Sequence, residues 1–307
     1  MKARKTILLS VIAVLLCVYI VQLVNSGRSK IKTLTLKDDF DTVTITDNGR
    51  KTILVKENGK WLVGDKKYTA DESTADRMIN TIKGIKILET VSRTDNAVVK
   101  ERYGFDKPLT VTASKGTKTV RTFIIGKSTS TGSQTYLRID GKNDTCLVSG
   151  SYKDIFGKTP DGIRSKKVYA LDRDSITDVK VSTDGSSWEI KKSGSPAAWD
   201  LVSGADGKTE IDGTHTSTWV HSLAQLSVRS WLDEKTQLPA REPDASVSFK
   251  AANKTYTVTV YKEMEKDKDG KDTVKDYLCT CSETQYLFTL APYMGEIFNK
   301  KLDDLKK

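Results

Sequence analysis

Residues 265–276, EKDKDGKDTVKD, place acidic side chains at the spacing of a calcium-binding loop. In such a loop, oxygen ligands at positions 1, 3, 5 and 12 surround the ion, and a glycine at position 6 allows the sharp turn. The matching residues are Glu265, Asp267, Asp269, Gly270 and Asp276. Position 1 is glutamate where the loop usually has aspartate, and position 12 is aspartate where it usually has a bidentate glutamate. Four lysines also lie between the acidic residues. Because the flanking segments also read as strands, we favour a solvated hairpin tip, and a calcium-dependent rise in melting temperature would support a metal site instead.

The histidines and cysteines are the other residues that commonly bind metals. His215 and His221 are six residues apart, whereas a helical pair of zinc ligands is four apart. Cys279 and Cys281 fall on one face of a predicted strand, where a disulfide between them would be strained. A zinc site would require these two pairs to meet, and no local spacing indicates that they do. We therefore predict no metal centre, no cofactor and no structural disulfide.

Two short motifs resemble parts of known catalytic sites. Residues 126–133, GKSTSTGS, end like a phosphate-binding loop, but Arg121 stands where that loop has its first glycine. No predicted helix follows whose N-terminus could bind phosphate, so a hairpin turn is the better interpretation. The Ser-Gly-Ser at 149–151 lacks the Gly-x-Ser-x-Gly turn of a serine hydrolase. Neither motif predicts a catalytic residue.

The N-terminus carries a hydrophobic segment that is separate from the folded body. Residues 6–24 contain no charge, and as a helix they would span about 28 Å, close to the thickness of the hydrocarbon core. A secretory signal usually has an apolar region of only about 7–15 residues, so we predict a retained single-pass anchor at residues 1–26. Cleavage after Ser26 is the alternative. A very short N-terminus before a single span is typical of a soluble body outside the cytoplasm, and we expect the protein in the cytoplasmic membrane.

The net charge of +10 is unevenly distributed along the chain. Residues 1–40 carry +5, residues 41–173 carry +9 and residues 174–307 carry −4. The basic half adjoins the predicted anchor, where anionic headgroups would attract it. Lysines that simply keep exposed strands and helix faces soluble explain the same excess, and we favour that explanation. Nucleic acid is a poor candidate partner for a body outside the membrane, and the sequence contains no aromatic–basic motif of a nucleic-acid-binding module, so we predict no nucleic-acid partner.

The remaining sequence reads as one unit used twice, at residues 41–173 and 174–307, after a linker at 27–40. In the first copy, Asn-Gly pairs at 48–49 and 58–59 supply the positive φ angles of tight hairpins. Asp71 is placed to cap a helix in which Ala75, Met78, Ile79, Ile82 and Leu88 share one face. Further strands and a short helix follow. The second copy repeats this order, with a hairpin turn at Asp184.

Paired landmarks in the two copies lie at a near-constant offset. These pairs are Trp61 with Trp199, Pro108 with Pro243, Tyr136 with Tyr277, and Ile155 with Ile297. We predict that the two tryptophans pack each sheet against its helix, since a buried indole removes about 150–250 Å² from water. The predicted fold class is α+β: an N-terminal transmembrane helix, then two similar units, each a mainly antiparallel curved sheet with one principal helix.

The segments GKWLV, YTADESTADRMINTI, RYGFDKPLTVT and FIIG…TYLRIDG resemble the bacterial family known as domain of unknown function 4340 (DUF4340). The likeness spans most of residues 41–300. Its most characteristic run is Gly104–Pro108, in which the family commonly shows leucine at the position of Phe105. Members look like membrane-anchored envelope proteins that accompany ABC transporters similar to those of gliding motility. The family has no established catalytic residues, so none is carried over.

These observations predict a non-catalytic, extracytoplasmic protein that is anchored in the membrane. The resemblance implies that it is an accessory or scaffold component of an ABC transport system, with permease or auxiliary subunits as partners. The alternatives are a solute- or polymer-binding envelope module and an envelope hydrolase. Anionic headgroups and envelope polymer are further candidate partners.

Overall fold

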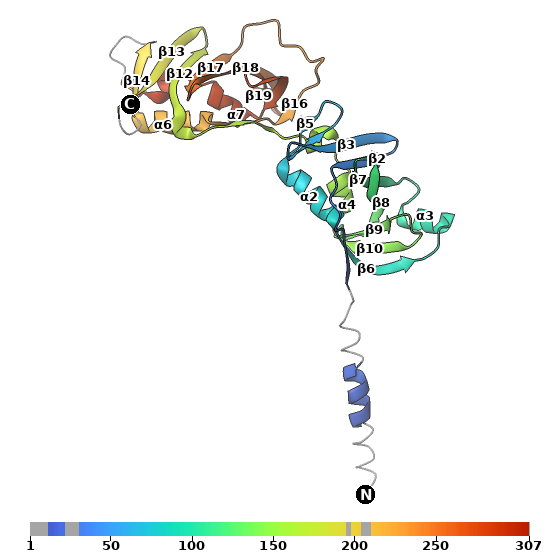
Figure 1. The fold of residues 1–307 in the computed structure, drawn as a ribbon. Coiled ribbons are helices and arrows are strands. Elements are labelled where there is room, and N and C mark those ends of the chain that lie inside the picture. Colours follow the sequence, from blue (N-terminus) through green and yellow to red (C-terminus); the bar gives the residue numbers. More distant parts are fainter. Residues whose placement is uncertain (1–11, 22–30, 195–197, 204–209, 307) are drawn as a thin grey trace. The chain divides into compact units, whose positions relative to one another are not determined.

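The computed structural model describes residues 12–21, 31–194, 198–203 and 210–306, which form two compact units (Figure 1). The units comprise Met1–Ser165 and Lys166–Lys307. The division therefore lies at 165/166 and not at 173/174, because β11 (Lys167–Ala170) pairs with β15 (Gln225–Ser227) of the second unit. Residues assigned to the linker also belong to the first unit, since they contain β1 (Lys32–Thr35).

The first unit is built on one ten-stranded sheet in which every neighbouring pair is antiparallel. In order across the sheet, the strands are β1 (Lys32–Thr35), β6 (Gly84–Ser92), β10 (Thr145–Ser149), β9 (Gln134–Ile139), β8 (Lys118–Ser128), β7 (Leu109–Lys115), β2 (Thr42–Asp47), β3 (Arg50–Glu57), β4 (Lys60–Val63) and β5 (Tyr68–Thr69). The predicted hairpins at 48–49 and 58–59 are confirmed, and all four turn residues have positive φ.

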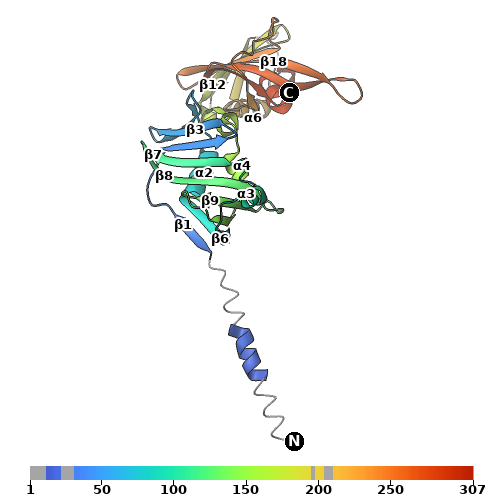
Figure 2. The same cartoon turned by 90° about the vertical axis from the view of Figure 1, so that its right-hand side faces the viewer.

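Helices cover one face of this sheet. Figure 2 shows α2 (Glu72–Lys83) and α4 (Tyr152–Phe156) behind β7 and β8. Alternate strand residues such as Val43, Ile45 and Val111 point to these helices and are fully or nearly fully buried. The predicted cap is confirmed, because the Asp71 side chain accepts a hydrogen bond from the Thr74 backbone N–H at 2.9 Å. Two short helices complete the unit: α3 (Ala97–Tyr103) and α5 (Pro160–Ile163).

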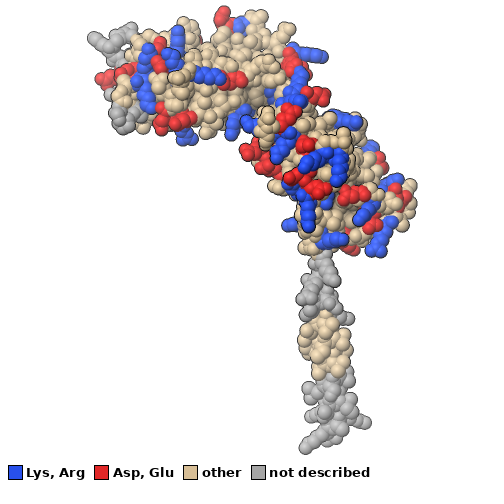
Figure 3. All heavy atoms as spheres, in the orientation of Figure 1, with Lys and Arg blue, Asp and Glu red and all other residues tan. Residues whose placement is uncertain are grey.

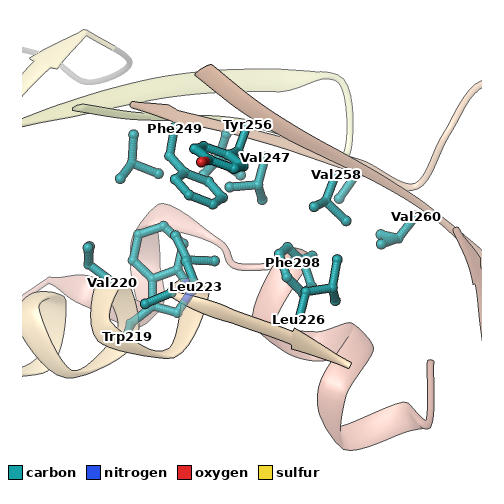
Figure 4. Close-up of a cluster of buried hydrophobic side chains, with 14 of the residues drawn as sticks. Trp219, Val220, Leu223, Leu226, Val247, Phe249, Tyr256, Val258, Val260 and Phe298 are labelled. Carbon is teal, nitrogen blue, oxygen red and sulfur yellow. The ribbon is translucent and has the colours of Figure 1, made fainter. Parts of the chain in front are cut away.

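The second unit is built on an eight-stranded sheet, again antiparallel at every step. In order, its strands are β14 (Ala198–Ser203), β13 (Ser186–Ser193), β12 (Ile176–Thr183), β17 (Ala245–Ala251), β18 (Lys254–Lys266), β19 (Asp272–Cys281), β20 (Thr284–Leu290) and β16 (Ser230–Trp231). The helices α6 (Gly213–Leu223) and α7 (Pro292–Phe298) pack on one face. Figure 4 shows Trp219 and Leu223 of α6 opposite Phe249 and Tyr256 of the sheet.

The two units share one strand order. Reading β4-β3-β2-β7-β8-β9-β10-β6 in the first and β14-β13-β12-β17-β18-β19-β20-β16 in the second gives the same connectivity. The long strand β6 pairs with both β1 and β10, and its counterpart is divided into β15, which pairs with β11, and β16, which pairs with β20. An isolated antiparallel β-bridge also recurs: it joins Ala70 to Arg164 in the first unit and Ile211 to Lys306 in the second. The chain therefore contains one α+β topology twice.

Strand register gives the equivalence of individual residues. Trp61 lies opposite Lys56 on β3, and Trp199 lies opposite Lys192 on β13, so the predicted tryptophan pair is structurally equivalent. The predicted pairing of Tyr136 with Tyr277 is wrong by one residue, because Thr135 is the true counterpart of Tyr277. A shift of one residue moves a side chain to the opposite face of a sheet.

The pairing of Pro108 with Pro243 is wrong by one residue as well, because Leu109 aligns with Ala245.

Two further predictions concern the principal helix of the first unit and the packing of the two tryptophans. The helix beginning after Asp71 ends at Lys83, and Leu88 lies in β6 and not on the helix. Trp199 is buried in the second core, whereas Trp61 is half-buried and packs beside Phe40 at the edge of the first.

The predicted membrane anchor at residues 1–26 lies largely outside the described residues. Within it, residues 12–21 form a helix. Across the described ranges, no helix combines the length and apolar character that a membrane crossing needs.

Candidate binding surfaces

The four acids of the calcium-loop pattern lie on both strands of the β18–β19 hairpin and at its tip. Glu265 is in β18 and Asp276 in β19, where Asp276 forms an ion pair with Arg229. At the tip, the Asp267 side chain accepts hydrogen bonds from the backbone N–H groups of Asp269 and Lys271, both at 2.9 Å. Asp267 therefore stabilises its own turn, and the four carboxylates are not brought together. The hairpin interpretation of this segment agrees with the structure.

The histidines and cysteines lie in different surroundings. His215 and His221 are both on α6, and the His221 Nε2 lies 3.6 Å from Asp174. Cys279 and Cys281 share one face of β19, as predicted, and both are buried in the core. Burial raises the pKa of both thiols above the ordinary value. In the part of the chain that the structure describes, no three His, Cys, Asp or Glu side chains are close enough to share a metal ion.

The segment that resembled a phosphate-binding loop is a hairpin turn between β8 and β9, as predicted. Its first glycine has a structural role that the sequence did not reveal. A Cβ at Gly126 would lie 2.3 Å from the carbonyl oxygen of Tyr103 and 3.0 Å from the ring of Phe105. The missing side chain at 126 therefore allows the segment around α3 to pack closely on the sheet.

The Gly104–Pro108 run fixes the end of α3 against the same sheet. Gly104 has a left-handed backbone, with φ 75°, and a Cβ there would lie 2.9 Å from the Lys127 backbone nitrogen. The next residue, Phe105, is buried, and its backbone N–H donates to the Lys100 carbonyl at 2.8 Å. The glycine is thus required both by the turn and by the close approach.

A buried arginine joins this segment to the sheet. The guanidinium of Arg138, on β9, lies over the Phe105 ring at 4.6 Å and donates to Asp95 at 2.6 Å. Arg138 holds the pKa of the Asp95 carboxyl below its usual value, mainly through this hydrogen bond. Alternation along β9 places Arg138 on the sheet face away from α2 and α4, so sequence analysis alone would assign it to solvent. It is buried because residues 93–108 fold back over it.

The equivalent segment of the second unit is built differently. Residues 232–244 contain no helix, and Thr280 replaces the buried arginine at the matching position of β19. A hollow of about 350 Å³ lies beside this segment, lined by Leu232, Asp233, Thr236, Gln285, Tyr286 and Leu287, among others. The first unit closes this part of its sheet, and the second leaves it open to solvent.

Each sheet also has a broad face turned away from its helices. In the first unit, ten half-buried and uncharged side chains on four adjacent strands lie on this face, and the charged side chains of Lys51 and Glu57 border them on β3. We call it the neutral face: Thr42, Thr44, Thr46, Ile53, Val55, Thr110, Thr112, Ser114, Thr122 and Ile124. One row across it runs Ile53, Thr44, Thr112, Thr122 in direct register. Figure 2 shows this side of β7 and β8 towards the viewer.

The matching positions of the second unit form what we call the charged face. Its residues are Asp178, Lys180, Ser182, Glu189, Lys191, Ser246, Ser248, Lys250, Thr257 and Thr259. Lys191 lies 3.4 Å from Glu189 and 3.8 Å from Asp178. A groove of about 180 Å³ runs over part of this face. Figure 3 shows Lys and Arg together with Asp and Glu side chains on the visible surface of both units.

The comparisons with known proteins agree with the resemblance found in the sequence. The family model of DUF4340, described as a domain of unknown function, matches residues 61–246. The chain belongs to this family. No curated protein and no solved structure matches the chain. The matched region of this DUF4340 protein runs from β4 to β17 and includes the Gly104–Pro108 run and the segment over Arg138.

The surfaces of this DUF4340 protein differ in the chemistry they can perform. The neutral face has no titratable side chain, so it offers van der Waals contact and hydroxyl hydrogen bonds but no acid or base. Hydroxyls there already pair in part, as between Thr122 and Thr112 at 3.4 Å. Such a face can bind another surface.

Proposed function

We propose that this DUF4340 protein is a non-catalytic, membrane-anchored, extracytoplasmic protein that serves as an accessory or scaffold component of an ABC transport system. Three observations support the proposal: the uncharged segment at residues 6–24, the family membership, and a body made of one unit used twice. The link to transport comes from the family resemblance, and a single-pass anchor would hold the body outside the cytoplasm.

The neutral face is the observation that carries a binding role. Charged residues make up 29% of the chain, yet the ten positions of the neutral face, which Lys51 and Glu57 border on β3, include none. Charged side chains on an exposed sheet face keep that face soluble and hinder its association with other proteins. A face of uncharged, β-branched side chains is therefore expected where another protein surface covers it. An accessory subunit needs such a surface, and it needs no catalytic group.

Co-purification from gently solubilised membranes tests this function. The full-length protein, tagged at its C-terminus, should recover permease and ATPase subunits of an ABC transporter. The matched control replaces residues 6–24 with a cleaved secretory signal, which releases the same body from the membrane, and it should recover less of both subunits. Recovery of the full-length protein alone, or with hydrolytic activity, would contradict the proposal.

A second candidate function is binding of a solute or envelope polymer. The groove of about 180 Å³ on the charged face favours it, because Ser248, Thr255 and neighbouring charged groups line a shallow surface that could hydrogen-bond a sugar chain. Glycan that remains bound through purification, and that is lost on Ser248→Ala, would select this function over the first.

A further inference from the structure

From the two sheet faces, we infer that the neutral face is the docking surface for an uncharged extracytoplasmic surface of a membrane protein held in the same bilayer. The inference rests on the proposed function, because it names the part of the body that would contact the transporter. It concerns the first unit only, and it assigns no such role to the charged face of the second.

Register makes the difference between the faces specific to positions. Thr44 corresponds to Lys180, because each lies opposite equivalent residues on both neighbouring strands. By the same pairing, Ile53 corresponds to Glu189 and Val55 to Lys191. The same backbone therefore accepts charge at these positions. The absence of charge from the neutral face of the first unit is a property of its side chains, and the fold does not require it.

Desolvation explains why an uncharged face suits a partner. Covering Lys180, Glu189 and Lys191 with a protein would remove solvated charges from water, which is costly unless each finds a new partner. Covering Ile53, Val55 and the threonine methyl groups gains hydrophobic free energy instead. Threonine hydroxyls can donate or accept, so they tolerate polar groups on the partner without fixing its charge. The complementary surface is therefore itself uncharged.

The size of the neutral face argues against a second copy of this chain as the occupant. With strands about 4.8 Å apart and alternate residues about 7 Å apart, four strands and three rows cover roughly 400 Å² including side chains. A stable interface buries about 800 Å² on each partner, so two such faces alone would pack too little area. A different membrane protein can extend its contact beyond the neutral face, and because it is confined to the same membrane it meets that face at a high effective concentration.

Chain length places the first unit within reach of such a partner. Seven residues, 25–31, separate the uncharged segment from β1, and a fully extended chain of that length spans at most about 25 Å. An anchor at residues 6–24 would therefore hold the first unit close to the bilayer surface. The partner would then be the extracytoplasmic part of a membrane protein, such as a permease or auxiliary subunit.

Site-specific photo-crosslinking in membranes of the native cell tests the inference. A photo-reactive residue replaces Thr112 at the centre of the neutral face, and the matched control replaces the equivalent Ser248 on the charged face. Both positions are half-buried, outward-facing strand residues, so the two replacements should disturb the fold to a similar extent. A melting temperature equal to that of the wild type checks that each variant folds. Adducts are identified by mass spectrometry.

The inference predicts an adduct between position 112 and a transporter membrane subunit, and none from position 248. Adding Thr44→Lys, Ile53→Glu and Val55→Lys, which copies the second unit's residues onto the first, should abolish that adduct. An adduct with another copy of this chain, equal adducts from both positions, or an adduct that survives the triple substitution would overturn the inference. If the wild-type protein co-purifies with transporter subunits while position 112 gives no adduct, docking lies elsewhere and only this inference fails. If no subunit co-purifies, the proposed function fails too.

Discussion

One buried position of the sheet carries a different side chain in each unit, and the surrounding core is packed differently as a result. In the first, the buried Arg121 on β8 donates to the carbonyl oxygens of Ile82 at 2.7 Å and Leu34 at 3.2 Å. At the register-equivalent position of the second, Tyr256 stacks on Phe249 with ring centroids 5.4 Å apart. Arg121 hydrogen-bonds two backbone carbonyl groups, whereas the rings of Tyr256 and Phe249 fill the equivalent volume with apolar surface. The backbone has been kept while the interactions on it have been exchanged.

A second pair of positions shows that such exchanges are coupled. Tyr277 of β19 is fully buried, and a Cβ on Gly295 of α7 would lie 2.0 Å from its ring. In the first unit the strand residue that corresponds to Tyr277 is Thr135, and its small side chain lets α4 approach closely enough for the Tyr152 backbone N–H to donate to the Thr135 hydroxyl at 3.1 Å. A large residue on one element requires a small one on the other. The two copies are therefore best compared by pairs of residues in contact and not by single positions.

The largest expected effect comes from the principal helix of the second unit. Trp219 is buried, and its indole N–H donates to the Ile297 carbonyl at 2.9 Å, which ties α6 to α7. Trp219→Ala should lower the free energy of unfolding by about 3–5 kcal/mol. Met78, at the equivalent place on α2, makes no such link, and Met78→Ala should cost somewhat less, about 2–4 kcal/mol. Denaturant unfolding measures both, and a larger loss for Met78→Ala would contradict the comparison.

Removing the buried arginine should have the next largest effect. Arg121→Leu leaves two carbonyl oxygens without their charged donor and should cost about 2–3 kcal/mol. Tyr256→Leu keeps most of the apolar volume and loses mainly ring stacking, so about 1–2 kcal/mol is expected. Both are read from urea unfolding followed by circular dichroism. Equal losses would mean that the hydrogen bonds of Arg121 add little to the first unit.

The coupled pair predicts a moderate effect of a single methyl group. Gly295→Ala forces the Tyr277 ring to move and should destabilise the second unit by about 1–3 kcal/mol. Lys153→Ala, a control on α4 of the first unit, changes an exposed side chain and should stay within about 0.5 kcal/mol of wild type. Thermal melting of both variants decides, and a neutral Gly295→Ala would show that the ring has room to move.

The helix caps should give two equal and smaller effects. Asp71 accepts from the Thr74 N–H at 2.9 Å, and Asp212 accepts from the His215 N–H at 2.8 Å. Asp71→Ala and Asp212→Ala should each cost about 1 kcal/mol, because each leaves one N–H of a helix start without its acceptor. A twofold or greater difference between the two losses would break the equivalence of α2 and α6.

The smallest effect is a pH dependence at the first cap. Hydrogen bonds from Ser73 and then Thr74 lower the pKa of Asp71 below its ordinary 3.8. A lowered folded-state pKa means that the cap stabilises above about pH 4 and that this contribution is lost as pH falls through the lowered value. The difference in melting temperature between wild type and Asp71→Ala should therefore shrink in acid. A difference that stays constant down to pH 3 would contradict the charged cap.

Local signals in the sequence predicted much of the repeated fold. Asn48-Gly49 and Asn58-Gly59 require positive φ angles, and Asp71 supplies a cap, so hairpins and helix start followed from residue chemistry. The helix end was missed because Leu88 continues the apolar spacing, although α2 ends at Lys83 and β6 begins at Gly84. Periodicity alone does not separate a buried strand from a helix over so short a run.

The candidate surfaces could not be predicted because they depend on register and on distant segments. Thr44 and Thr112 are 68 residues apart in the chain and become neighbours only through the β2–β7 pairing. Burial of Arg138 depends on residues 93–108, which pack over a face that strand alternation assigns to solvent. Acidic spacing at 265–276 suggested a calcium loop, whereas the pairing of β18 with β19 separates the ends of that segment from a common centre.

Reciprocal exchange of three side chains tests most directly whether the two copies have divided their roles. One variant carries Thr44→Lys, Ile53→Glu and Val55→Lys, and the other carries Lys180→Thr, Glu189→Ile and Lys191→Val. The measurement is the amount of transporter permease recovered with each full-length protein from solubilised membranes. We predict that the first exchange abolishes recovery while the second leaves it at the wild-type level. Recovery that is unchanged by the first exchange, or lost only with the second, would contradict the assignment of binding to the neutral face.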